Sequence, residues 1–134
     1  MTESAPAPTN LKGKKLLWVE DDQFLKNIIS HKLAQEDVAI VYAQEGQSAL
    51  ALAASEKPDL IVLDILLPGI DGVEVLRQLK ANPATQAIPV IMFSNVDDKA
   101  RIDETHKLGV AGFFVKTSMT MDEIIAEMSK ALAK

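Results

Sequence analysis

The residues best suited to chemistry in this chain stand directly after short apolar runs. Asp64 follows the apolar run 60–63, and Glu20 and Asp21 follow the apolar run 16–19. A buried carboxylate is costly unless it is paired or used, so two apolar runs that both end in acids indicate a site. If the runs are neighbouring strands of a parallel sheet, their carboxyl ends meet at one edge. Ligand sites of open α/β sheets lie at that edge.

These acids predict a site for a hard divalent cation. At about 4 Å, like charges near a protein surface repel by on the order of a few kcal/mol at an effective dielectric near 20. Mg²⁺ relieves such repulsion, and it prefers oxygen ligands from one or two carboxylates, waters and phosphate groups. Acidic turns are common, so an acidic loop edge without an ion is the alternative that Glu20 and Asp21 leave open when they are considered alone.

A hydroxyl and an ammonium group arrive at the same predicted edge. Ser94 closes the apolar run 91–93, and Lys116 follows the apolar run 113–115. Beside carboxylates and a metal ion, they complete what a phosphoryl group requires, with the metal, the ammonium and the hydroxyl each taking one oxygen. Asp64 is then the candidate nucleophile that forms an aspartyl phosphate. The joint placement at four strand ends carries this hypothesis.

Five strand-like patterns alternate with five helix-like patterns along the chain. The predicted strands are short and apolar, as is typical of strands covered on both faces, and they span 15–19, 39–43, 60–64, 90–94 and 112–115. The alternation predicts an α/β fold, a doubly wound five-stranded parallel sheet of order 2-1-3-4-5 with five helices. That order places the first and third strands side by side and so brings Glu20, Asp21 and Asp64 together.

Capping signals mark the helices. Asp22 is the predicted N-cap of the first helix, and Thr120 with Glu123 predicts a capping box for the last one. The fourth predicted helix, 97–108, has little apolar stripe. Either a solvated helix held mostly by its ends or a mobile helix that faces a partner fits this pattern.

Length and composition exclude several functional classes. A chain of 134 residues fits one domain with a core, and a formal net charge of −5 argues against direct nucleic-acid binding. Because there is no cysteine, disulfide frameworks and thiolate chemistry are excluded. His31 and His106 are expected to be ordinary surface or boundary residues.

The sequence gives no sign of membrane insertion. No apolar run approaches the roughly 18 residues of a membrane span, and the N-terminus lacks the basic and apolar segments of a secretory signal. We therefore expect a cytoplasmic protein without membrane contact. A disordered tail is predicted at 1–13, and the folded domain at 14–134.

The combined pattern resembles the receiver domain of two-component response regulators. The resemblance rests on the segments 16–22, 60–72, 90–94 and 113–116 and extends over about residues 14–134. It implies a phosphoprotein that takes a phosphoryl group from a histidine kinase or phosphotransfer protein and signals to an output protein that the sequence does not identify. Any catalysis would be limited to self-phosphorylation and slow self-dephosphorylation.

The resemblance also implies roles for single residues. Asp64 is the phosphoacceptor, Ser94 the switch hydroxyl and Lys116 the phosphate-binding lysine. The implied Mg²⁺ ligands are four oxygen donors: Glu20, Asp21, Asp64 and the backbone carbonyl of Leu66.

Further implied roles concern signalling and lifetime. Phe113 is the switch aromatic, and with Ile102 it marks an output surface on the fourth helix, fifth strand and fifth helix. Leu66 and Val96 stand two residues after the phosphoacceptor and the switch hydroxyl, where polar groups can orient the attacking water. Because leucine and valine offer no such group, slow self-dephosphorylation is expected.

The sequence departs from the family pattern at three positions. Thr117 follows Lys116 where a proline in a cis peptide is usual. A non-proline cis bond costs roughly 2.5–4 kcal/mol, so we expect a trans bond or an altered loop. Asn95 follows Ser94 where a smaller residue is usual, and Phe113 lacks the tyrosine hydroxyl that is more common there.

Other protein classes compete with this interpretation. A phosphatase of the haloacid dehalogenase type needs an acid where Leu66 stands, and a flavodoxin-like electron carrier needs a phosphate loop that the acids at 20–22 would repel. A receiver-like binding module that works without phosphorylation remains open, as does a receiver excised from a longer multidomain regulator.

Overall fold

The computed structural model describes residues 10–133 and contains one parallel sheet of order β2-β1-β3-β4-β5. Its strands are β1 (Lys14–Val19), β2 (Val38–Ala43), β3 (Leu60–Leu63), β4 (Val90–Ser94) and β5 (Gly112–Val115). Its helices are α1 (Gln23–Leu33), α2 (Gly46–Glu56), α3 (Gly72–Ala81), α4 (Lys99–Lys107), the short 3₁₀ helix η1 (Lys116–Ser118) and α5 (Met121–Leu132). The predicted doubly wound fold and its strand order are confirmed.

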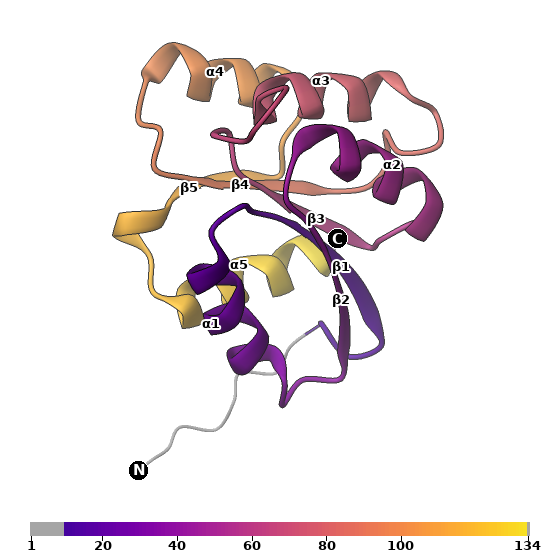
Figure 1. The fold of residues 1–134 in the computed structure, drawn as a ribbon, viewed down its shortest axis with the longest axis vertical. Coiled ribbons are helices and arrows are strands. Elements are labelled where there is room, and N and C mark those ends of the chain that lie inside the picture. Colours follow the sequence, from indigo (N-terminus) through magenta and orange to yellow (C-terminus); the bar gives the residue numbers. More distant parts are fainter. Residues whose placement is uncertain (1–9, 134) are drawn as a thin grey trace.

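Helices cover both faces of the sheet, with α1 and α5 on one side and α2, α3 and α4 on the other (Figure 1). Alternating strand residues therefore enter two separate cores. On β1, Leu17 packs into the core under α2 and α3, whereas Trp18 packs into the core under α1 and α5. There, Trp18 meets Phe93 edge to face, with ring centroids 6.0 Å apart. Burial on both faces explains why the inner strands β1, β3 and β4 are mostly apolar.

The predicted helix caps are formed. The Asp22 carboxylate accepts hydrogen bonds from the main-chain N–H groups of Phe24 and Leu25, at 2.9 and 3.3 Å. At the start of α5, Thr120 and Glu123 make the reciprocal pair of a capping box. Local sequence thus sets where these helices begin.

Helix α4 is polar, and two ion pairs link it to α3. It spans Lys99–Lys107, shorter than the predicted 97–108, because Asp98 is its N-cap. Arg101 of α4 pairs with Asp71, the N-cap of α3, at 2.5 Å, and Arg77 of α3 pairs with Glu104 of α4. The structure shows these ion pairs but does not decide between the solvated and the partner-facing interpretation of this helix.

The predicted tail is too long at its C-terminal end. Residues 1–9 lie outside the described part of the chain, but Asn10 and Leu11 are docked onto the domain. The Asn10 side chain donates to the Ser129 carbonyl at 2.8 Å, and Leu11 is fully buried in the core under α1 and α5. A single apolar residue in a polar segment gives too little periodicity to predict such docking.

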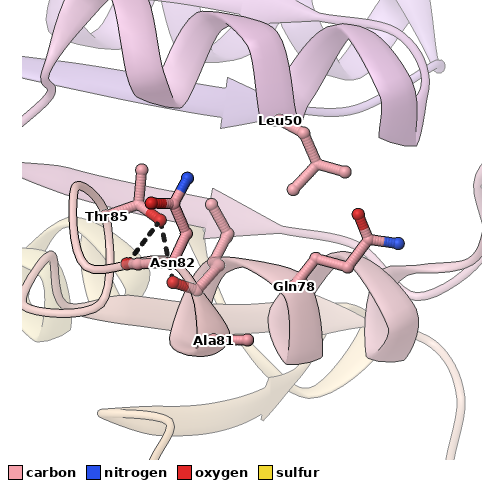
Figure 2. A pocket seen from close by; sticks show the side chains of 6 residues that line it. Leu50, Gln78, Ala81, Asn82 and Thr85 are labelled. Carbon is pink, nitrogen blue, oxygen red and sulfur yellow. Dashed lines mark hydrogen bonds between the residues drawn. The ribbon is translucent and has the colours of Figure 1, made fainter.

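The far end of α3 is closed by a buried threonine. Thr85 donates through its hydroxyl to the Leu79 carbonyl at 2.8 Å, as Figure 2 shows beside a hollow between α2 and α3. Because α3 runs back from the carboxyl end of β3, this hollow lies at the amino-terminal edge of the strands. It is therefore remote from the acids that follow β1 and β3.

Within residues 10–133, no helix combines the length and the apolar character needed to cross a membrane. His31 and His106 are exposed, on α1 and α4, in agreement with the prediction for both.

Candidate functional site

Three ionisable side chains meet at the carboxyl ends of β1, β3 and β5. The Lys116 ammonium nitrogen lies 2.7 Å from Asp64 Oδ2 and 2.6 Å from Glu20 Oε1. All three groups are withdrawn from solvent, since Glu20 is 2% and Asp64 6% exposed and the Lys116 side chain is 15% exposed. A lysine that follows the last strand thus bridges acids that follow two others.

Sheet register brings the two acids together. Val19 is paired with Leu63, so the residues that follow, Glu20 and Asp64, leave adjacent strands at the same level. The Asp64 N–H still reaches the Val19 carbonyl at 3.3 Å, and the Glu20 N–H reaches the Ala43 carbonyl of β2 at 2.9 Å. Strand β3 ends at Leu63, one residue earlier than predicted, so Asp64 opens the following loop.

The second oxygen of each acid is held by a nearby main-chain N–H. Glu20 Oε2 accepts from Asp22 at 3.1 Å, and Asp64 Oδ1 accepts from Leu66 at 3.2 Å. Each carboxylate therefore has one oxygen on the lysine and one on its own loop. This arrangement fixes the orientation of both groups before any ligand enters.

A glycine makes room for the main chain of the phosphoacceptor candidate. A Cβ atom on Gly72 would lie 2.0 Å from the Asp64 carbonyl oxygen and 2.7 Å from the Ile65 Cα, both backbone atoms that cannot move aside. The Gly72 N–H also donates to the Ile65 carbonyl at 2.8 Å. The first turn of α3 thus packs directly against the loop that carries Asp64, and only glycine permits this approach.

The electrostatics of the site are set by burial and by a shared cation. Burial raises the pKa of the Glu20 carboxyl above its ordinary value, and the hydrogen bond and charge of Lys116 offset this only in part. Burial by itself would lower the pKa of Lys116, but its hydrogen bonds to Asp64 and Glu20 and their charges raise it. The lysine is therefore held firmly in its charged form.

Ser94 is fully buried at the end of β4, the strand next to β3. Its hydroxyl oxygen accepts a hydrogen bond from the Val96 N–H at 3.3 Å. A serine hydroxyl can accept and donate at the same time, so this contact leaves its own proton available for a ligand oxygen.

The predicted cluster of three carboxylates is not formed. Asp21 is exposed, and within residues 10–133 no three acidic, histidine or cysteine side chains are arranged to hold a metal ion. Lys116 takes one oxygen of Glu20 and one of Asp64 instead. The donors nevertheless fit a hard cation, because two buried carboxylates share a single ammonium.

The remaining predicted residues lie around this centre. Leu66 is 60% exposed beside Asp64, while Val96 and Phe113 are partly buried against the core under α2 and α3. Ile102 is partly exposed on α4. The peptide between Lys116 and Thr117 is trans, as are all peptide bonds within residues 10–133.

Sequence reasoning missed a side-chain link between two loops of the site. Asn95 Oδ1 accepts a hydrogen bond from the Thr117 N–H at 3.1 Å. The sequence marks Asn95 and Thr117 only as two unrelated departures from the family pattern. The sequence did contain a signal for this contact. Asn95 and Thr117 each directly follow a proposed site residue, and the strands β4 and β5 that precede them are neighbours in the sheet.

Comparison with known proteins agrees with this geometry. A family model described as the response regulator receiver domain matches residues 16–129. The chain belongs to this family. As a receiver domain of two-component systems, it is 34% identical over 102 residues to the response regulator PleD of Caulobacter vibrioides, with 76% of this chain covered. The match spans only 22% of the length of PleD.

Solved receiver structures share the fold. The BeF₃-activated N-terminal receiver domain of Klebsiella pneumoniae RstA superposes with a TM-score of 0.80 at 28% identity, covering 90% of this chain and 99% of that one. The Mn²⁺-bound form of response regulator Rcp1 superposes with a TM-score of 0.75 at 26% identity, covering 87% of this chain and 90% of that one.

Proposed function

We propose that this receiver domain accepts a phosphoryl group on Asp64, from a histidine kinase or phosphotransfer protein, in a Mg²⁺-dependent reaction. The observation that carries the proposal is the bridge from Lys116 to Asp64 and Glu20, at 2.7 and 2.6 Å. An ammonium fixed beside a buried carboxylate is placed to neutralise the oxygens of a phosphoryl group bound there. The activation of the RstA receiver domain by BeF₃ supports the same use of the site in a relative.

In this reaction, a carboxylate oxygen of Asp64 attacks phosphorus on the phosphohistidine. The new P–O bond forms as the P–N bond breaks, and the electron pair of that bond returns to the imidazole nitrogen. Lys116 transfers its hydrogen bond from Asp64 to a phosphoryl oxygen, and the buried Ser94 hydroxyl donates to another. Catalysis consists of positioning and charge neutralisation, as is general for phosphoryl transfer.

The proposed metal site uses Glu20, Asp21, Asp64 and the Leu66 backbone carbonyl. When bound, Mg²⁺ supplies the charge that the single lysine does not, next to the phosphoryl oxygens. The Mn²⁺-bound form of Rcp1 supports a divalent cation in a relative of this fold. In this chain it is supported by the two buried carboxylates of Glu20 and Asp64, which share one ammonium.

The proposed switch runs from Ser94 to Phe113 and the surface of α4, β5 and α5. Movement of Ser94 toward the phosphoryl group leaves space beside Phe113. The Phe113 side chain is only partly buried and packs against the core under α2 and α3. Ile102 on the polar helix α4 then contacts the output protein. Amide NMR with beryllofluoride, a phosphoryl mimic, should shift Phe113 and residues 99–107, and unshifted signals there would contradict this switch.

The test of phosphorylation is a comparison of two aspartate variants. Asp64→Asn should abolish incorporation of acid-labile phosphate from a small phosphodonor in Mg²⁺. Asp97→Asn, which alters an exposed aspartate in the loop after β4, should retain it. Equal labelling of Asp64→Asn and the native chain would reject the proposed function.

A further inference from the structure

The hydrogen bond between Asn95 and Thr117 joins the two loops that carry the candidate phosphate-binding groups. Asn95 follows Ser94 directly, and Thr117 follows Lys116 directly. Asn95 Oδ1 accepts from the Thr117 N–H at 3.1 Å, although the residues are 22 apart in sequence. A contact here therefore bears on the main chain next to both Ser94 and Lys116.

This bond extends the sheet beyond its last main-chain pair. The register between β4 and β5 ends at Ser94 and Val115. If the two strands continued in parallel, a main-chain carbonyl of the β4 side would serve an N–H on the β5 side. At Thr117, a side-chain carbonyl supplies that acceptor instead. The loop after β5 is thereby tied to the loop after β4 at the point where the ladder stops.

Lys116 depends on such a tie more than the acids do. Its ammonium sits at the end of a flexible four-carbon stem, and β5 lies at the edge of the sheet with β4 as its neighbour. The weak bond from the Met119 N–H to the Lys116 carbonyl, at 3.4 Å, closes η1 but does not attach it to the sheet. Glu20 and Asp64, by contrast, follow inner strands and are each held by their own loops.

We propose that Asn95 is a positioning residue, whose side-chain carbonyl holds the Thr117 N–H and thereby fixes Lys116 beside Asp64. The inference rests on the proposed function, because it concerns how the lysine meets a phosphoryl group. It predicts that the larger effect falls on the phosphoryl side of the site. Ligands that bind only the carboxylates should sense Asn95 much less.

The experiment separates these two sides with two ligands. The native chain, Asn95→Ala and Thr117→Ala are each titrated first with Mg²⁺ alone and then with beryllofluoride in saturating Mg²⁺. Asn95→Ala removes the acceptor, whereas Thr117→Ala keeps the main-chain donor and serves as the matched control. Both residues are exposed, so neither change removes core packing.

A net hydrogen bond contributes about 0.5–1.5 kcal/mol, so Asn95→Ala should weaken beryllofluoride binding by about two- to tenfold. The dissociation constant of Asn95→Ala for Mg²⁺ should change by less than about twofold. Hydrogen exchange at its Thr117 amide should accelerate by about the same factor as beryllofluoride binding weakens. Thr117→Ala should match the native chain in all three measurements.

Three results would overturn the inference while leaving the proposed function intact: unchanged beryllofluoride affinity in Asn95→Ala, equal losses for Mg²⁺ and beryllofluoride, or an unaltered Thr117 amide. Failure of the native chain itself to bind beryllofluoride in Mg²⁺ is a different outcome. It would reject the proposed function and, with it, the role of Asn95.

Discussion

Glu20 and Asp64 share one ammonium group, that of Lys116, and all three side chains are largely withdrawn from solvent. Two carboxylates and one lysine leave an excess of negative charge. Burial, which disfavours the ionised form, raises the pKa of Glu20. The folded state therefore binds a proton at Glu20 more tightly than the unfolded chain does. At the scale of the residue, the site is prepared for an additional cation at the expense of stability without one.

The raised pKa of Glu20 predicts how the stability of a Glu20→Gln variant depends on pH. Because the folded pKa lies above the ordinary value of 4.5, the stabilising effect of the protonated group is complete below that pH and is lost as the pH rises through the folded pKa. In metal-free buffer, Glu20→Gln should therefore gain stability over the native chain between pH 4.5 and pH 7. Denaturant unfolding measures this gain, and the exposed Glu45→Gln is the control. If the stability of Glu20→Gln relative to the native chain fell between pH 4.5 and pH 7, this prediction would be wrong.

The lifetime of the phosphorylated state also belongs to the residue scale. Leu66 and Val96 offer no hydrogen bond to an attacking water, and we expect slow self-dephosphorylation. The double variant Leu66→Asn, Val96→Glu should lose phosphate at least about tenfold faster, equivalent to about 1.4 kcal/mol of barrier. The decay of purified phosphoprotein measures the rate. Complete native decay within seconds, or an unaccelerated variant, would disprove this explanation.

At the scale of elements, α3 and α4 are joined by ion pairs between charged side chains. Asp71 caps α3 through the Glu74 N–H at 3.0 Å and pairs with Arg101 of α4. Burial opposes ionisation of Asp71, but these two contacts together lower its pKa below 3.8. Its contribution to stability is thus present above that value and is lost as the pH falls through the folded pKa.

Two substitutions separate the cap from the ion pair. Asp71→Ala removes both and should cost about 1 kcal/mol of unfolding free energy, the usual worth of an N-cap. Asp71→Asn keeps a capping oxygen and loses only a half-exposed charge pair, which contributes about 0–1 kcal/mol. Thermal unfolding at pH 7 should rank the native chain, Asp71→Asn and Asp71→Ala in that order. Equal losses in both variants would assign the effect to charge alone.

The elements were largely predictable from sequence because their signals are local. Apolar runs and caps such as Asp22 and Thr120 fix strands and helix starts, and strand ends placed Glu20, Asp64 and Lys116 at one edge. The direct contacts of Lys116 with Glu20 and Asp64 were not predictable. No local pattern shows that a lysine after β5 reaches acids that follow β1 and β3. The docking of Leu11 was missed for the same reason, because its partners lie in distant segments.

At the scale of the whole molecule, helices cover both faces of one sheet (Figure 1). The sheet separates two cores and carries the acids and the lysine of the site at one edge. Ligand binding at that edge acts on the stability of the entire domain, because the acids are part of the folded state and are scattered in the unfolded chain. Binding to the folded state alone stabilises it by an amount fixed by ligand concentration.

Mg²⁺ should therefore stabilise the domain as a unit. At a free concentration ten times its dissociation constant, linkage gives about 1.4 kcal/mol. Thermal unfolding at constant ionic strength measures the effect, and Asp64→Asn, which lacks one charged ligand, should show a smaller shift. A melting temperature that ignores millimolar Mg²⁺ would contradict the proposed metal site.

The central claim is that Asp64 carries the phosphoryl group, and chemical mapping tests it most directly. An acyl phosphate on an aspartate is reduced by borohydride to an alcohol, which marks the residue permanently for peptide mass spectrometry. After treatment with a phosphodonor in Mg²⁺, we predict the resulting homoserine at position 64, at a level that falls when Mg²⁺ is chelated. Modification at another aspartate, or its absence from position 64 in phosphorylated protein, would contradict the assignment.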